Sequence, residues 1–176
     1  MWFTPTRGAS NWLWLSFFII LFDQITKAMV TRSLDLYESI ELLPVLKLTH
    51  QLNRGAAFSI LANAGGWQRW FFIGLALIIS AVLMVWLRRI RTPGQTILAI
   101  GLALVLGGAL GNVIDRVWLG HVVDFVAVHW GDAYFPSFNV ADSAISVGAG
   151  CLLIDAFLES GREKAREKSK RENSTG

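Results

Sequence analysis

Four long apolar blocks dominate the pattern of hydrophobic and polar positions along this chain. The two central blocks contain no charged residue between Trp70 and Leu87 or between Pro93 and Ile114. A bilayer core about 30 Å thick requires about 20 helical residues, and each block is long enough to supply them. The pattern therefore predicts four membrane-spanning helices, at about residues 12–30, 67–87, 93–114 and 139–158.

The connections between the blocks have other patterns. Apolar and polar residues alternate over residues 46–53, which is typical of a β-strand with one buried face. Pro44 precedes this strand, and Gly55 allows a turn that returns the chain as a second strand over Ala57–Leu61. We expect a small β-element here, lying on the membrane. The connection over Asp115–Phe138 is rich in aromatic residues and is expected to form a loop or a short interfacial helix.

Basic residues beside the blocks predict the orientation of the chain. Arg88 and Arg89 lie between the second and third blocks, and the C-terminal segment 162–176 is also rich in Lys and Arg. Such residues collect on the cytoplasmic side, and an even number of spans places both termini on one side. We therefore expect both termini in the cytoplasm, with the basic tail near anionic headgroups and the first and third connections outside.

Composition excludes several classes of protein. The chain is 53% hydrophobic and only 16% charged, which is typical neither of a disordered chain nor of an ordinary soluble enzyme. Its net charge is +3, but the basic residues flank the apolar blocks instead of forming one stripe, so we expect no nucleic-acid partner. The single cysteine, Cys151, permits no intrachain disulfide, and the three histidines form no zinc motif. We expect neither a metal nor another cofactor.

Ionisable residues inside membrane spans are costly and therefore indicate functional sites. Asp23 and Lys27 lie four residues apart in the first block, so their side chains are within reach of each other. This spacing suits either a structural ion pair or a pair that contacts a substrate. Asn112, Asp115 and Arg116 share a helix face at the end of the third block. We expect Arg116 to keep Asp115 ionised, which suits an orienting or structural role.

Asp124 and Asp142 have opposed surroundings. Asp124 lies among valines and a phenylalanine, where burial is expected to raise its pKa. If Asn139 is the N-cap of the fourth helix, Asp142 stands at its third position, where the helix dipole favours a carboxylate. Capping alone is an alternative explanation for Asp142. Two carboxylates in contrasting environments are typical of acid–base catalysis, in which one activates water and the other polarises a carbonyl group.

Five short motifs follow one another at four-span spacing: Asp23–Lys27, Asn53–Phe58, Gly111–Arg116, Val122–Phe125 and Phe138–Ser143. In this order they resemble the motifs of the lipoprotein signal peptidases (signal peptidase II), a family of membrane-embedded aspartic proteases of bacteria. The resemblance extends from about Trp12 to Phe157.

The resemblance implies an all-α membrane protein of four helices with a β-cradle between the first and second helices, formed by residues 1–161. It implies removal of the signal peptide from prolipoproteins just before a diacylglyceryl-modified cysteine. Asp124 and Asp142 are the expected catalytic pair; Asp115 is a rival that we rank below Asp124. The expected location is the bacterial inner membrane, as a monomer among lipids, with the site toward the outer leaflet. Residues expected to bind or orient the substrate are Asn53, Gly55, Asn112, Asp115, Arg116, Asn139, Asp23 and Lys27.

Two other classes of function remain as alternatives. A proton-coupled transporter would use Asp23, Asp124 and Asp142 as a relay, although the chain lacks the inverted repeats and broken helices of such proteins. A non-catalytic membrane scaffold would need none of these acids.

Overall fold

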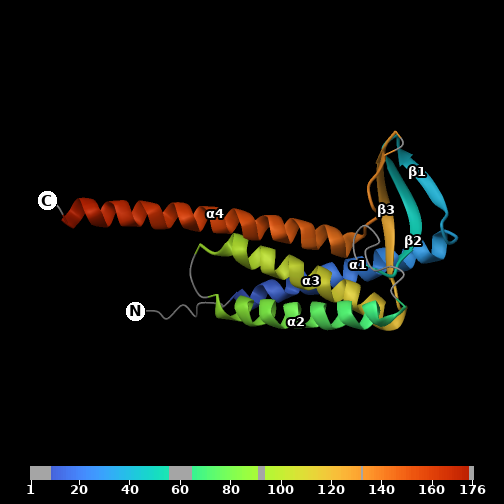
Figure 1. Ribbon diagram of the computed structural model, residues 1–176, viewed down its shortest axis with the longest axis horizontal. Helices are drawn as coiled ribbons and strands as arrows, with labels where there is room; N and C mark the ends of the chain where they lie inside the picture. The colour runs from blue at the N-terminus through green and yellow to red at the C-terminus, as the bar shows by residue number, and fades with distance from the viewer. Residues whose placement is uncertain (1–8, 56–64, 91–93, 132, 175–176) are drawn as a thin grey trace.

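The computed structural model describes residues 9–55, 65–90, 94–131 and 133–174. Within them, four long helices lie alongside one another as a bundle, and a small sheet stands at one end (Figure 1). Each helix is long and apolar enough to cross a membrane, so the four predicted spans are confirmed. The helices are α1 (Leu13–Ser33, after the short 3-10 helix Ala9–Trp12), α2 (Trp67–Arg89), α3 (Thr96–Trp118) and α4 (Val140–Ser174).

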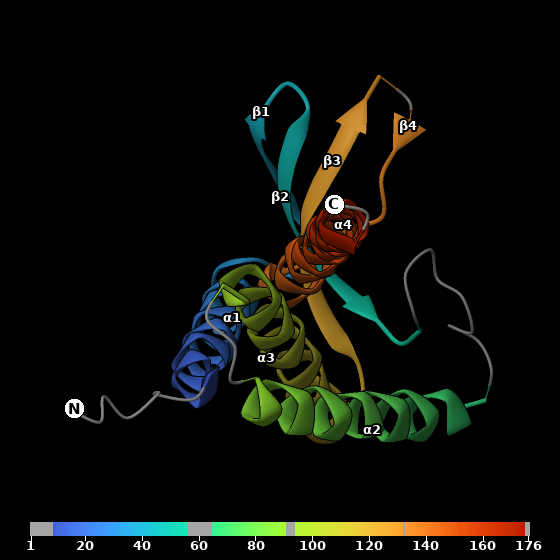
Figure 2. The ribbon, with the colours of Figure 1, turned by 90° about the vertical axis from the view of Figure 1, so that its left-hand side faces the viewer.

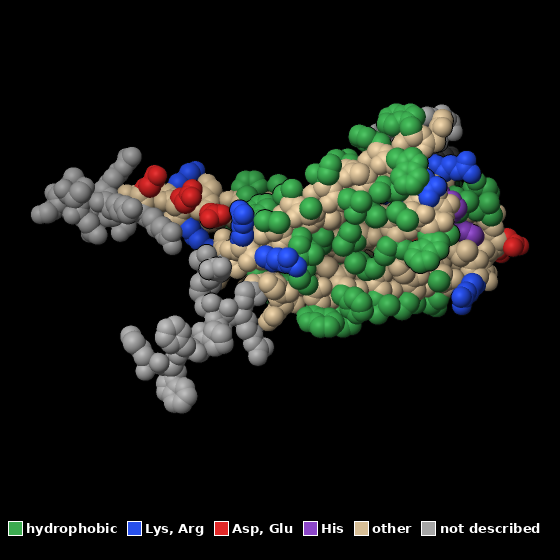
Figure 3. All heavy atoms as spheres, turned by 90° about the horizontal axis from the view of Figure 1, so that it is seen from below, with side chains coloured by type: hydrophobic (Ala, Val, Ile, Leu, Met, Phe, Trp, Pro, Cys, Tyr) green, Lys and Arg blue, Asp and Glu red, His purple; other side chains and the backbone are tan. Residues whose placement is uncertain are grey.

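Helix α3 is the centre of the bundle, and the other three helices pack against it (Figure 2). Its leucines Leu102 and Leu106 are almost fully buried and pack with Leu87 of α2. Large apolar side chains elsewhere, such as Phe18 and Ile78, are exposed along the length of the bundle (Figure 3). In a chain of this composition that surface faces lipid, which is as apolar as the side chains themselves.

Glycines allow α4 to approach α3 closely. A Cβ atom at Gly108 would collide with the backbone carbonyl oxygen of Ala141, at the start of α4. About two turns earlier on α3, a Cβ at Gly101 would lie 2.9 Å from the carbonyl oxygen of Gly148 in α4. Small residues at such contacts let helix backbones pack directly, which is a principal source of helix association in membranes. The first turn of α4 is therefore fixed by its contact with Gly108.

We expect Gly108→Ala to lower the free energy of unfolding by about 1–3 kcal/mol, because the added methyl group must displace α4. Thermal unfolding of the purified protein in detergent measures this loss. Gly74→Ala is the matched control, since a Cβ at Gly74 meets nothing within 4 Å and alanine favours a helix. Equal unfolding temperatures for the two variants would contradict the close packing of α3 against α4.

The sheet is formed by two connections, the one between α1 and α2 and the one between α3 and α4. Its strands are β1 (Ser39–Leu43), β2 (Leu46–Asn53), β3 (Val122–Trp130) and β4 (Ala133–Tyr134), antiparallel and in that order. The predicted strand over residues 46–53 is confirmed as β2. The predicted strand over Ala57–Leu61 lies outside the described residues. Figure 2 shows the sheet rising away from the helices.

The prediction of a loop or interfacial helix over Asp115–Phe138 is wrong. Most of this connection is the nine-residue strand β3, which pairs with β2 so that Gln51 lies opposite Asp124 and Asn53 opposite Val122. The valines of β3 have the branched side chains that favour a strand, and its first four residues are buried against neighbouring elements. The partner strand is distant in sequence, so the pairing was not visible in the local pattern.

Helix α4 continues to Ser174, well beyond the predicted end of its span near residue 158. It projects past the other helices at the end opposite the sheet (Figure 1). Residues 159–174, which form the extension, are rich in Glu, Lys, Arg and Ala, which are strong helix formers, and include one glycine, Gly161. The basic tail is therefore a continuation of the last helix.

Candidate functional site

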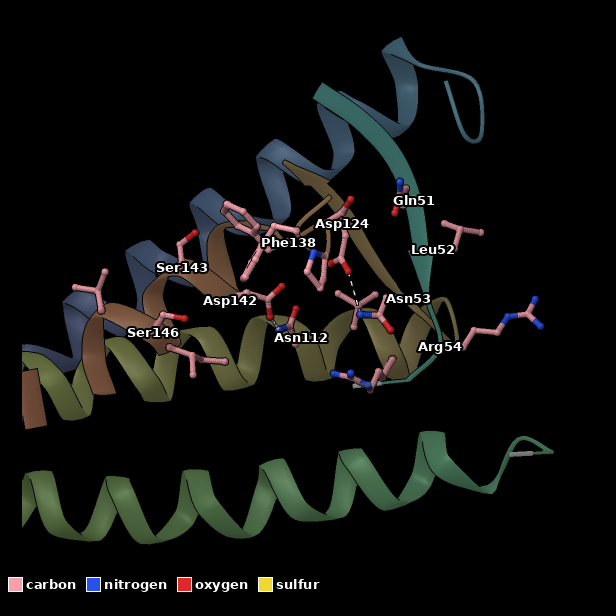
Figure 4. Close-up of a pocket in the computed structure, with 17 residues that line it drawn as sticks. Gln51, Leu52, Asn53, Arg54, Asn112, Asp124, Phe138, Asp142, Ser143 and Ser146 are labelled. Atoms are coloured by element: carbon pink, nitrogen blue, oxygen red, sulfur yellow. Dashed lines mark hydrogen bonds between the residues drawn. The ribbon is translucent and has the colours of Figure 1, made fainter. Parts of the chain in front are cut away.

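A cavity of about 650 Å³ lies where the sheet meets the helices, and two carboxylates line it (Figure 4). Asp124 reaches it from β3 and is only 3% exposed. Asp142 reaches it from the first turn of α4 and is half-buried. The structure thus brings together the two acids that the sequence singled out, here called the aspartate pair.

Asn139 holds both members of the aspartate pair. Its fully buried side chain donates from Nδ2 to Asp124 Oδ1 at 2.8 Å. Its Oδ1 accepts a hydrogen bond from the backbone N–H of Asp142 at 2.9 Å, while its own N–H donates to Asp142 Oδ2 at 3.2 Å. These reciprocal bonds are a capping arrangement at the start of α4, as the sequence predicted. One residue therefore fixes the position of one acid relative to the other.

Two more amides complete the hydrogen bonding of the pair. Asn53 of β2 donates from Nδ2 to Asp124 Oδ2 at 3.0 Å, and the backbone N–H of Gly55 in turn donates to Asn53 Oδ1 at 2.9 Å. Asn112 of α3 donates from Nδ2 to Asp142 Oδ1 at 2.8 Å. Every carboxylate oxygen of the pair therefore accepts a hydrogen bond from an N–H group. Figure 4 shows Asn53, Asn112 and the aspartate pair around the cavity.

The surroundings of Asp124 raise its pKa from 3.8 to about 7. Burial is the largest cause, because it disfavours the charged carboxylate, and the nearby charge of Asp142 adds to it. Hydrogen bonds from Asn53 and Asn139 and the charge of Lys27 act in the opposite direction but are weaker. The raised pKa expected from the sequence is confirmed, and Asp124 can hold a proton near neutral pH.

Directly behind the cavity lies a buried triad formed by Asp23, Lys27 and Asp115. Lys27 Nζ lies 2.7 Å from Asp23 Oδ2 and 2.9 Å from Asp115 Oδ2, and all three side chains are at most 4% exposed. The same Nζ donates to Asn112 Oδ1 at 3.0 Å. Because the other end of that amide donates to Asp142, Asn112 connects the buried triad to the aspartate pair.

The predicted partner of Asp115 is wrong: Lys27 pairs with it, not Arg116. Arg116 is the next residue on α3, and consecutive helical side chains point about 100° apart. Arg116 donates from Nη2 to the carbonyl oxygen of Gly55 at 2.9 Å, and its guanidinium lies 5.2 Å from the ring centroid of Phe72. It therefore joins the end of β2 to α3 and to α2 at the edge of the cavity.

Gln24 and the apolar wall of the cavity were not among the site residues predicted from the sequence. Gln24 of α1 donates from Nε2 to Asp115 Oδ1 at 2.8 Å, so it helps to hold Asp115, the member of the buried triad that belongs to α3. A polar side chain next to Asp23 in an apolar helix was the available signal. The wall includes Phe135 and Phe138, whose rings meet edge to face at 6.2 Å, and Ile145 of α4.

The comparisons with known proteins agree with this arrangement. A family model described as signal peptidase (SPase) II matches residues 15–158. The chain belongs to the signal peptidase II family. Membership makes it an enzyme, a peptidase of the aspartic class, and its four spans make it a multi-pass membrane protein.

Individual members of the family are similar over most of their length. A lipoprotein signal peptidase of Pseudomonas aeruginosa (strain UCBPP-PA14) is 53% identical over 152 residues, covering 85% of this chain and 89% of the relative. The lipoprotein signal peptidase of Pseudomonas syringae pv. tomato (strain DC3000) is 54% identical, covering 85% of this chain and 87% of the relative.

Two solved structures share the fold. One, a bacterial membrane enzyme studied by the in meso method at 2.3 Å resolution, has a TM-score of 0.77 and 31% identity, covering 88% of this chain and 92% of that one. A second, at 1.9 Å resolution, has a TM-score of 0.71 and 32% identity, covering 82% and 91%. The arrangement of four helices with a small sheet is therefore that of the signal peptidase II structures.

Proposed function

We propose that this chain removes signal peptides from prolipoproteins by cleaving the peptide bond before a diacylglyceryl-modified cysteine, with Asp124 and Asp142 activating the water. Family membership supports the substrate class, since the relatives are lipoprotein signal peptidases. The observation that carries the mechanism is that two carboxylates, from β3 and α4, face one cavity and are positioned by Asn139 between them.

In this mechanism the aspartate pair shares one proton. Asp124 holds it, because its pKa is raised to about 7, and donates it in a hydrogen bond to the carbonyl oxygen of the scissile bond. Asp142, as a carboxylate, takes a proton from a water molecule, whose oxygen attacks the carbonyl carbon. Asp124 gives its proton to the carbonyl oxygen as the tetrahedral intermediate forms. Asp142 then gives its proton to the leaving amine while Asp124 takes a proton back from a hydroxyl group of the intermediate. The C–N bond breaks, which leaves a carboxylic acid and restores the aspartate pair to its starting state.

The positioning residues support this division of roles. Asn53, Asn112 and Asn139 keep the two carboxyl groups apart and oriented, so that little reorganisation is required during the reaction. Arg116 holds Gly55 at the edge of the cavity, where the peptide backbone of a substrate would enter. The apolar wall that includes Phe138 suits the lipid chains of the modified cysteine.

The placement of the cavity suits a substrate anchored in the outer leaflet of the bacterial inner membrane. The aspartate pair lies at the sheet end of the bundle, whereas Arg88 and Arg89 end α2 at the opposite end. By the distribution of basic residues, that opposite end and both termini are cytoplasmic. A lipidated peptide bond would then reach the acids at the depth where hydrocarbon meets water. We take residues 1–161 as the peptidase unit and a monomer as the active form.

The direct test combines purified protein, a diacylglyceryl prolipoprotein and mass analysis of the products. The expected result is a cut immediately before the lipidated cysteine. Ion-coupled uptake into liposomes without cleavage would favour the transporter instead, and no activity of either kind would favour a scaffold.

We expect cleavage to decline as the pH rises through about 7, because Asp124 then loses the proton that the mechanism requires. Measuring kcat/KM from pH 5 to pH 9 checks this. Stability should change in the same direction. Between the ordinary pKa of 3.8 and about 7 the folded state holds a proton that the unfolded state has released, so the free energy of unfolding falls as the pH rises through this range. An Asp124→Asn variant should lack this fall.

A further inference from the structure

A second cavity, of about 570 Å³, lies at the sheet end of the bundle and is lined mainly by polar groups. It is formed by the start of α2, the turn between α3 and β3, and the end of β2. Among its described lining residues are Arg54, Arg69 and His121, and none of them is an aspartate or glutamate. It is called the arginine pocket below, and it shares only Arg54 with the cavity of the aspartate pair.

Arg69 is fixed in this pocket but retains free hydrogen-bonding capacity. Its Nη2 donates to the carbonyl oxygen of Val117 at 2.8 Å, and its guanidinium carbon lies 5.0 Å from the ring centroid of Trp70. Its buried Nε has no hydrogen-bond partner among the described residues. A guanidinium has five N–H donors in a planar fork that matches the oxygens of a phosphate, and the bond to Val117 engages one of the five.

The backbone around Arg69 leaves the pocket open. Gly120 has φ of +83°, and a Cβ there would lie 3.4 Å from Nη1 of Arg69. Helix α2 begins with its N-cap at Gly66 and has no acidic residue in its first turn. The positive end of the helix dipole therefore adds to the field of the two arginines.

Three exposed tryptophans mark the depth of the arginine pocket in the membrane. Trp67 and Trp70 begin α2 and are 55% and 65% exposed, and Trp118 ends α3 and is 83% exposed. Exposed tryptophans at helix ends collect at the level of the lipid headgroups. Basic side chains and histidines also gather at this end of the molecule in Figure 3. The anions present at that depth in a bilayer are lipid phosphates.

We propose that the arginine pocket binds the phosphate of an anionic phospholipid in the leaflet that contains the sheet. Arg69 and Arg54 provide the charge-assisted hydrogen bonds, and the face of Trp70 and the side chain of Leu119 contact the glycerol region. Because Arg54 also lines the cavity of the aspartate pair, the bound lipid lies beside the entrance used by the substrate. This assignment goes beyond the proposed function and does not depend on the roles of the aspartates.

The test is native mass spectrometry of the full chain released from detergent with phosphatidylglycerol or with phosphatidylcholine of the same acyl chains. One phosphatidylglycerol should remain bound at concentrations where phosphatidylcholine is lost. The double variant Arg54→Gln/Arg69→Gln should bind phosphatidylglycerol at least about tenfold more weakly, because two charged contacts are removed. Arg32→Gln is the matched control, an exposed arginine at the same end of the bundle on α1, and should bind as the unaltered chain does.

Two further arms make the result decisive. Soluble glycerol 3-phosphate at equal concentration should not displace the lipid; displacement would show a site for free phosphate esters and overturn the lipid assignment. If the double variant loses its fold, Arg54→Gln alone decides, since Arg54 is exposed, and a loss of about fivefold is expected. Equal retention of both lipids, or unchanged binding by the arginine variants, would overturn the proposal.

Discussion

Asp124→Asn and Asp142→Asn are each expected to lower prolipoprotein cleavage by at least about a thousandfold while the protein remains folded. Asparagine has nearly the shape of aspartate but can neither share the proton nor take one from water. The hydrogen bonds from Asn53 and Asn112 can still reach the remaining carbonyl oxygen of the new amide. Cleavage is measured by mass analysis of the lipidated product, and folding by thermal unfolding in detergent.

The two variants should differ in a diagnostic way. In Asp142→Asn the charge that helps to raise the pKa of Asp124 is gone, so that pKa should fall and the remaining pH dependence of stability should shift to lower pH. Asp35→Asn is the control, because Asp35 is an exposed acid before β1, remote from the cavity. Near-normal cleavage by either variant of the pair would remove that residue from the mechanism.

Local sequence patterns predicted those parts of the fold that depend on near neighbours. The helices follow from apolar blocks of sufficient length, and β2 follows from the alternation of its three leucines with polar residues. The capping bonds between Asn139 and Asp142 also lie within one helical turn. In each case the physical cause operates over a few residues, so the sequence displays it directly.

The two predictions that were wrong, the structure of the connection that forms β3 and the partner of Asp115, depended on contacts between distant segments. Strand β3 forms because β2, some seventy residues earlier, supplies its hydrogen-bond partners. Asp115 pairs with Lys27 because α1 packs on α3, where the absence of a side chain at Gly111 leaves space for the carboxylate of Asp23. A sequence shows that Asp115 needs a cation. Which of two cations it meets depends on how the helices pack.

The same long-range contacts explain why the candidate site residues fall into two layers. Asn53, Asn112 and Asn139 touch the aspartate pair. The buried triad is connected to it through Asn112 and through the backbone N–H groups of Ala141 and Val123, the neighbours of Asp142 and Asp124. All of these candidate site residues were selected by one rule, polar residues at membrane depth. That rule identifies the region of the site but does not separate groups near the substrate from groups that hold the helices together.

Lys27→Met is expected to lower the free energy of unfolding by about 3–5 kcal/mol, because it leaves the carboxylates of Asp23 and Asp115 buried without a cation. Thermal or denaturant unfolding in detergent measures the loss. Lys47→Met is the matched control: its ion pair with Glu41, at 3.2 Å, lies on the sheet where solvent screens it, so its loss should change the stability far less than the loss of Lys27.

The triple variant Asp23→Asn/Lys27→Met/Asp115→Asn separates stability from catalysis. Replacing every charge of the buried triad removes the unpaired carboxylates, so much of the lost stability should return. Asn112 still lacks the Lys27 donor, and its Oδ1 keeps only the longer bond from Asn139 Nδ2 at 3.3 Å, so its Nδ2 is held toward Asp142 less firmly. Cleavage should therefore stay low in a variant that folds. Recovery of both properties together would show that the buried triad only holds α1 against α3 and does not position the aspartate pair.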